Sequence, residues 1–202
     1  MKPETHFYDL IRAVTDTERV RIGRARQLIS PANQTEPMTF ILHEGVAATY
    51  RSSDHLLIKY IKAPIIIGMN EFIDTNADIS IKAYSAVRYE ILPLKELLDI
   101  INEKGLWKDV AYTYMYTIRQ LLCAHHSSVG LSTYDLIRLN LIDLINEEQE
   151  LSAHVNVCDY IQEKTRLSRS RVMNILSDLR TGGYIEIKRG ILININNLPE
   201  KY

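Results

Sequence analysis

The sequence predicts an α+β protein, with antiparallel β-structure in its N-terminal half and helices followed by a β-hairpin near its C-terminal end. Three patterns support this prediction. Short strand-like runs fill residues 40–92, an apolar stripe of helical spacing spans residues 107–125, and two helical segments precede a hairpin pattern in residues 157–195. Strands that follow one another without intervening helices favour an antiparallel sandwich or barrel.

The composition is that of a globular protein without a membrane segment. The 202 residues are 46% hydrophobic and 24% charged, enough for one domain or two small ones. No apolar run approaches the length of a membrane span, and the first 20 residues lack the features of a secretory signal. Cys123 and Cys158 are too few for a four-cysteine metal site. We therefore expect a cytoplasmic protein without a metal.

The strand-like runs of the N-terminal half are separated by turn residues. The stretch FILHEGVAATYRSSDHLLIKYI holds two runs, with Gly45 at a tight turn and the polar residues 51–55 between the runs. APIIIGM and ISIKAYSAVRYEIL add three more short strands, and LPLKELLDIINEKG then turns helical. These runs predict a β-structured domain over residues 1–105.

Residues 106–130 predict a long helix with a single apolar seam. The seam residues are spaced 4, 3, 4, 3 and 4 apart, as in a coiled coil. They are Trp107, Ala111, Tyr114, Ile118, Leu121 and His125. Such a helix midway through the chain favours a homodimer, and packing on its own domain is the alternative. Ser132 is placed to cap a further helix, which begins the last predicted domain, residues 131–202.

A basic segment near the C-terminus is hidden by the net charge of −1. Residues 1–150 contain 16 Lys and Arg against 20 Asp and Glu, a net charge of −4. Residues 164–189 contain 7 Lys and Arg against 2 Asp and Glu, a net charge of +5. A basic segment on an acidic body indicates a polyanion site, and a solvated surface helix is the alternative.

Residues 157–181 show the pattern of two short helices joined by a tight turn. The first helix spans residues 157–165, and Ser168 is placed to cap the second. Arginine at a helix N-terminus opposes the helix dipole, so a phosphate or a base edge explains Arg169 and Arg171 better than helix stability does. The second helix has an amphipathic apolar stripe: Val172, Ile175, Leu176 and Leu179. This order predicts a helix-turn-helix whose second helix enters the major groove of DNA.

A basic hairpin follows that second helix. Gly182 and Gly183 end the helix, and the strand-like residues 184–187 and 191–195 flank the turn Lys188–Gly190. This hairpin is typical of a wing that contacts phosphates. The residues expected to contact double-stranded DNA are Ser168, Arg169, Ser170, Arg171, Asn174, Lys188 and Arg189.

The order of these elements resembles the CRP/FNR family of bacterial transcription regulators over nearly the full length. The matching stretches are ILHEGVA, IIIGM and LSRSRVMNIL, the last being similar to the family's C-S-R-x-x-V-x-R-x-L. The resemblance implies a β-roll like that of cyclic-nucleotide-binding domains, a dimerisation helix and a winged helix-turn-helix. It also implies base reading by Arg169, Ser170 and Asn174, a role in transcription regulation, with a stress response as one setting, and RNA polymerase as a partner. Two positions differ from the family. Arg166 stands where glycine is frequent, and Asn174 stands where arginine is frequent.

The nucleotide pocket of the family is where this sequence departs most. Nucleotide-binding relatives have a Gly-Glu pair and, about ten residues later, an arginine for the phosphate. Here Gly68 is followed by Met69, no arginine lies between Arg51 and Arg88, and Lys82 is the only cation in the expected stretch. A buried phosphate without its bidentate partner is costly. We therefore expect no cyclic AMP in the family manner, and no other cofactor is indicated.

The sequence is compatible with two functions. The first is a homodimeric, sequence-specific DNA-binding regulator. The second is a sensory or interaction protein whose β-roll binds a ligand or partner and whose winged helix is structural. Motifs of nucleotide hydrolysis, serine hydrolysis and zinc proteolysis are absent, so we expect no enzyme. A redox role for Cys123 or Cys158 needs an exposed thiol with a lowered pKa.

Overall fold

The computed structural model places the chain in two compact units, Met1–Leu122 and Cys123–Tyr202. In the described residues, no helix combines the length and the apolar character that crossing a membrane requires. The division between the units falls within the long helix, so the boundaries expected at residues 105 and 130 stay a prediction. The residues described are 2–31, 36–69, 79–126, 131–147, 152 and 155–200, with side chains of 120, 121 and 123–126 excepted.

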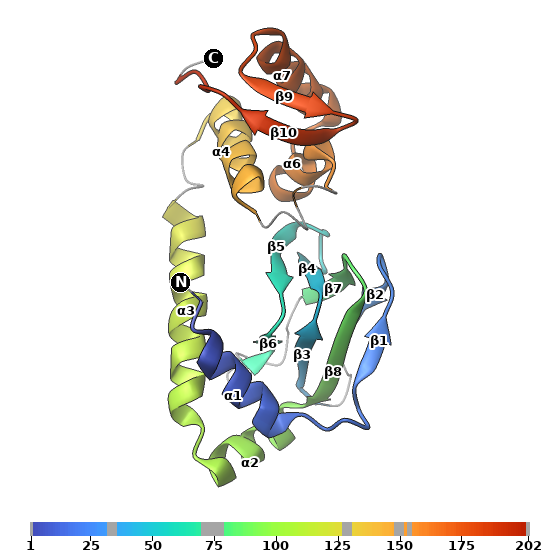
Figure 1. Cartoon of the computed structure of the whole chain (residues 1–202), viewed down its shortest axis with the longest axis vertical. Coiled ribbons are helices and arrows are strands. Elements are labelled where there is room, and N and C mark those ends of the chain that lie inside the picture. Colours follow the sequence, from blue (N-terminus) through green and yellow to red (C-terminus); the bar gives the residue numbers. More distant parts are fainter. Residues whose placement is uncertain are drawn as a thin grey trace. The chain divides into compact units, whose positions relative to one another are not determined.

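The first unit contains two antiparallel sheets packed face to face (Figure 1). One sheet has the strand order β1-β8-β3-β6 and the other β2-β7-β4-β5. Side chains from both sheets, such as Phe40 and Tyr89 from the first and Ile61 and Ile81 from the second, form one buried cluster. The predicted β-roll is therefore confirmed. Its strands are β1 Arg21–Gly23, β2 Leu28–Ile29, β3 Met38–Glu44, β4 Val46–Arg51, β5 Leu57–Lys62, β6 Ile65–Ile67, β7 Ile79–Ala83 and β8 Val87–Pro93.

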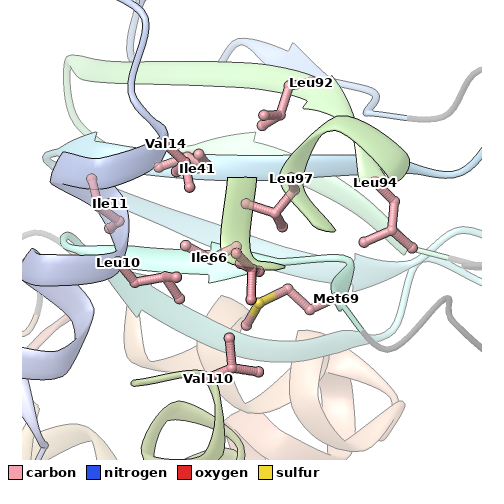
Figure 2. Packing of buried hydrophobic residues seen from close by; sticks show 11 residues of the cluster. Leu10, Ile11, Val14, Ile41, Ile66, Met69, Leu92, Leu94, Leu97 and Val110 are labelled. Carbon is pink, nitrogen blue, oxygen red and sulfur yellow. The ribbon is translucent and has the colours of Figure 1, made fainter. Parts of the chain in front are cut away.

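Three helices cover the outer face of the β1-β8-β3-β6 sheet. They are α1 Glu4–Val14, α2 Leu94–Lys104 and α3 Trp107–His126. Figure 2 shows Leu10 of α1, Leu97 of α2 and Val110 of α3 pointing toward Ile41 and Ile66 of the sheet. Because each of these side chains is at most 6% exposed, their burial ties the three helices to one face of the roll.

Helix α1 was not predicted from the sequence, although its apolar stripe is visible there. Phe7, Leu10, Ile11 and Val14 are buried along one face of α1, at the spacing of an amphipathic helix. On the polar side, His6 Nδ1 lies 2.6 Å from Asp109 Oδ1, and the His6 ring stacks on Tyr112 with centroids 4.0 Å apart. These contacts attach α1 to α3.

A buried carboxylate lies beneath the segment that leads from α1 to β1. The Glu90 side chain is 0% exposed, and its oxygens lie 3.2 Å from Arg19 Nε and 3.4 Å from His43 Nε2. The Asp16 backbone N–H points at the same carboxylate from 3.4 Å. Burial raises the pKa of Glu90 above its usual value and lowers the pKa of His43.

The described residues of the second unit form helices and a β-hairpin (Figure 1). Ser132 caps the first helix in a capping box with Asp135, as the sequence predicts for Ser132. Tyr134, near the start of this helix, donates its hydroxyl to the Pro199 carbonyl at 2.6 Å, which ties the chain end to the helix. The elements are α4 Thr133–Asn146, α6 Val157–Thr165, α7 Arg169–Thr181, β9 Ile185–Lys188 and β10 Ile191–Ile195.

Candidate nucleic-acid interface

Helices α6 and α7 form the predicted helix-turn-helix. Asn156 caps α6 by accepting the backbone N–H groups of Cys158 and Asp159, and Ser168 caps α7 by accepting that of Arg171. Arg166 ends α6 with a φ of 61°, in the left-handed region that glycine adopts most readily. That conformation gives a physical reason why a glycine is suited to this turn.

The apolar stripe of α7 faces its own unit and leaves the other side of the helix to solvent. Val172, Ile175, Leu176 and Leu179 are buried, each 7% exposed or less. The same unit also buries four residues of α6: Val157, Cys158, Tyr160 and Ile161. Because one stripe is buried, the rotation of α7 about its axis is fixed, and with it the direction of its polar side chains.

The residues predicted to read DNA lie together on the solvent side of the α7 N-terminal half. These exposed residues are Ser168, Arg169, Ser170, Arg171 and Asn174. Met173 also lies on this surface and is 47% exposed, which adds an apolar group of the kind that contacts a thymine methyl group. The helix therefore presents guanidinium, amide and hydroxyl groups from one face.

The hairpin behind α7 has the geometry of a wing. Its turn contains Arg189 and Gly190, with φ values of 51° and 83°. Gly190 is packed against the start of α6, since a Cβ there would lie 2.4 Å from Asn156 Nδ2, and its carbonyl accepts the Val157 N–H at 2.9 Å. The wing is thus anchored to α6, while Lys188 and Arg189 stay exposed at its tip.

Each of two cations on this surface has an acidic partner. Arg169 Nη1 lies 2.7 Å from Asp159 Oδ1, and Lys188 Nζ lies 2.8 Å from Glu186 Oε1. In each case the neighbouring carboxylate raises the pKa of the cation. Neither acid belongs to a sequence motif, so neither was predicted. Asp159 meets Arg169 only because of the turn between α6 and α7.

Cys158 does not have the features of a thiol sensor. Its side chain is buried, and burial raises the pKa of the thiol. A reactive cysteine needs exposure and a lowered pKa, so Cys158 serves as part of the core between the helices. The side chain of Cys123 lies outside the described residues.

Only some of the residues predicted to form the α3 seam lie on the exposed face of the helix. Trp107 and Ile118 are 47% and 52% exposed, and Ala111 is exposed with them. Tyr114 instead packs against the core of its own unit, and burial raises the pKa of its hydroxyl. The side chains of Leu121 and His125 lie outside the described residues. The exposed face continues through two residues that the prediction left out, Met115 at 63% and Leu122 at 54% exposure.

Comparison with known proteins agrees with this geometry. Residues 133–200 match the family model for winged helix-turn-helix DNA binding. The inhibitor of hydrogen peroxide resistance of Escherichia coli K12 is 34% identical over 187 residues, which cover 91% of this chain and 89% of that protein. The chain belongs to the family of the inhibitor of hydrogen peroxide resistance. Its second unit is a winged helix-turn-helix DNA-binding domain.

Two solved structures that share the fold of this member of the hydrogen peroxide resistance inhibitor family are described as regulators. The c-di-GMP-responsive global regulator CLP of Xanthomonas campestris has a TM-score of 0.77 at 13% identity, covering 96% of this chain and 100% of that one. A CRP/FNR family regulator from Thermus thermophilus has a TM-score of 0.53 at 18% identity, covering 87% of this chain and 93% of that one. The CRP/FNR-like fold expected from the sequence is therefore confirmed.

Proposed function

We propose that the chain is a homodimeric, sequence-specific DNA-binding transcription regulator. The observation that carries the proposal is the exposed polar face of α7, where Arg169, Arg171 and Asn174 project beside a wing with Lys188 and Arg189. A winged helix with only a structural role needs no such concentration of cations on a solvent-facing surface. The buried stripe of α7 further supports the proposal, because it fixes that face in one orientation.

The roles of the individual residues follow from hydrogen-bonding geometry. Arginine pairs with the O6 and N7 atoms of guanine, and asparagine with the N6 and N7 atoms of adenine, so Arg169 and Asn174 read bases. Ser168 and Ser170 contact a phosphate or a nearby base edge, and Arg171 adds a phosphate contact. Lys188 and Arg189 bind the backbone, which raises affinity and salt dependence without sequence choice.

In the proposed DNA-binding protein, two copies of the chain dimerise through α3. The exposed apolar residues recur after four, four, three and four residues, a spacing close to that of a coiled-coil seam. A two-fold axis along α3 gives two recognition helices and a palindromic site with half-sites about 34 Å apart. The exposed residues proposed for this seam are Trp107, Ala111, Met115, Ile118 and Leu122.

We also propose that cyclic AMP is not the effector. Met69 stands where nucleotide-binding relatives have the ribose-binding glutamate, and its side chain is 6% exposed within the apolar cluster of α1, α2 and the sheet. Lys82 Nζ lies over the Tyr50 ring, 5.9 Å from its centroid, so this cation already has a local aromatic partner. Residues 70–78, the rest of the pocket segment, lie outside the described residues. Unchanged DNA affinity with added cyclic AMP is the expected result.

The setting of the regulation is proposed from the relative's name. Because a relative is called an inhibitor of hydrogen peroxide resistance, we propose target genes whose products act under peroxide stress. RNA polymerase is the proposed partner at those promoters. Transcript profiling of a deletion strain with and without hydrogen peroxide tests this setting, and an identical response of the deletion and parent strains contradicts it.

Selection of genomic fragments by the purified full chain at two salt concentrations tests DNA reading. A palindromic motif that persists at the higher salt supports the regulator. Arg169→Ala and Asn174→Ala are each expected to cost about 1–3 kcal/mol at one base pair per half-site. Arg180→Ala is the matched control, because Arg180 is exposed at the opposite end of α7 and should leave base preference unchanged.

The result that would overturn the proposal is also defined by this experiment. Binding that ignores sequence and disappears at the higher salt leaves a basic surface without a reading function. The alternative, a sensory or interaction protein with a structural winged helix, then becomes the better account. Retained selectivity in both Arg169→Ala and Asn174→Ala contradicts the residue roles while leaving a regulator.

A further inference from the structure

The Arg169 guanidinium is held by two side chains of the preceding helix. Its Nη1 atom lies 2.7 Å from Asp159 Oδ1 and 3.2 Å from Gln162 Oε1. Asp159 and Gln162 are three residues apart on α6, so they lie on the same face of that helix. Both hydrogens of Nη1 therefore have an acceptor on α6.

This arrangement leaves a defined edge of the guanidinium for DNA. The Nε and Nη2 groups of Arg169 have no partner in the described part of the chain, and the Arg169 and Asp159 side chains are 60% and 54% exposed. The Nε–Nη2 edge presents two parallel N–H donors, which is the geometry that matches the O6 and N7 acceptors of guanine. An exposed ion pair of this kind adds little to stability, so stability does not account for it.

The carboxylate also changes what the arginine prefers to bind. A free arginine on a DNA-facing surface is attracted to any phosphate, whereas the pair formed by an arginine and a carboxylate has no net charge and attracts a phosphate less. Asp159 repels phosphates as well. Its presence beside Arg169 therefore weakens sequence-independent binding while leaving the base-facing donors in place.

We propose that Asp159, assisted by Gln162, is a specificity-determining positioning residue that directs Arg169 to a base edge rather than to phosphate. The inference rests on the proposed DNA-reading function. Asp159 itself needs no contact with DNA for this role, because it acts through Arg169.

The test measures base discrimination and salt dependence of the full chain on fluorescent duplexes. The first duplex contains the selected site. A set of duplexes differs from it only at the base pair whose preference is lost in Arg169→Ala, with one substitution in each duplex. A last duplex is unrelated in sequence. Asp159→Asn is expected to lower discrimination at that base pair about tenfold, within the range of one bidentate contact. On the unrelated duplex, Asp159→Asn should steepen the slope of log affinity against log salt concentration by about 0.9.

Two further variants separate positioning from a general effect of charge. Asp159→Glu keeps the carboxylate and should retain most of the discrimination. Glu186→Gln removes the acid that pairs with Lys188 on the wing, so it deletes the same charge from the same surface. Because Lys188 contacts phosphate in the proposed complex, this control should raise affinity for all duplexes alike and leave discrimination unchanged.

The outcomes distinguish this inference from the function on which it rests. If the wild-type chain binds without sequence preference, the proposed function fails and the inference fails with it. If Arg169→Ala loses discrimination and Asp159→Asn keeps it, the inference alone is overturned. The same holds if Asp159→Asn lowers discrimination further in an Arg169→Ala background, because the effect then does not pass through Arg169.

Discussion

Replacing Ile118 by alanine tests whether α3 joins two copies of the chain. The Ile118 side chain is 52% exposed in the middle of the exposed apolar face of α3. Complete burial of an isoleucine is worth about 1.5–3 kcal/mol, so covering its exposed half contributes about 0.75–1.5 kcal/mol per protomer. A symmetric dimer covers two copies of this side chain, which contribute about 1.5–3 kcal/mol together, and most of this free energy is lost in the variant.

The expected change is large enough to measure. Each 1.4 kcal/mol is a tenfold change in a dissociation constant, so Ile118→Ala should weaken the dimer about 10- to 140-fold. Alanine is the best helix former, so α3 itself should persist. Sedimentation equilibrium of the full chain across a range of concentrations measures the dissociation constant directly.

A matched control removes a similar side chain elsewhere. Ile22 in β1 is 77% exposed and does not belong to α3, so Ile22→Ala should leave the dissociation constant unchanged. Equal dissociation constants for wild type, Ile118→Ala and Ile22→Ala would refute the assignment of the α3 face. A wild-type chain that stays monomeric at high concentration would refute dimerisation as a whole.

Three further predictions concern stability and reactivity. Ser168→Ala removes the cap of α7 and should cost about 1 kcal/mol, seen as about fivefold faster amide hydrogen exchange along α7; unchanged exchange contradicts it. Burial raises the pKa of Glu90 in the folded chain above its value in the unfolded chain, 4.5. The contribution of Glu90 to stability is therefore complete below pH 4.5 and is lost as the pH rises through the folded-state pKa. Glu90→Gln should therefore gain stability relative to wild type with rising pH in urea unfolding, and parallel curves would count against this. In a Cys123→Ser background, the buried Cys158 thiol should react with iodoacetamide only after unfolding, and rapid labelling of the native chain would show an accessible thiol.

The elements of the second unit could be predicted from the sequence because their signals are local. A cap at Ser168, an apolar stripe from Val172 to Leu179 and the glycines at 182 and 183 each act within a few residues of chain. The helix α1 has an equally local apolar stripe and is predictable in the same way. The packing of Tyr114 against its own unit could not be predicted in this way. The spacing of a seam does not say which side of a helix its own unit covers.

The sequence by itself determined the order of elements, the capped recognition helix and the basic wing, because apolar spacing and caps fix helices and strands locally. Only the tertiary structure decided which cations have partners and which carboxylates are buried. Asp159 reaches Arg169 across 10 residues, and Glu90 meets the Asp16 backbone across 74. Such pairs depend on how separate elements pack, and no local pattern encodes that packing.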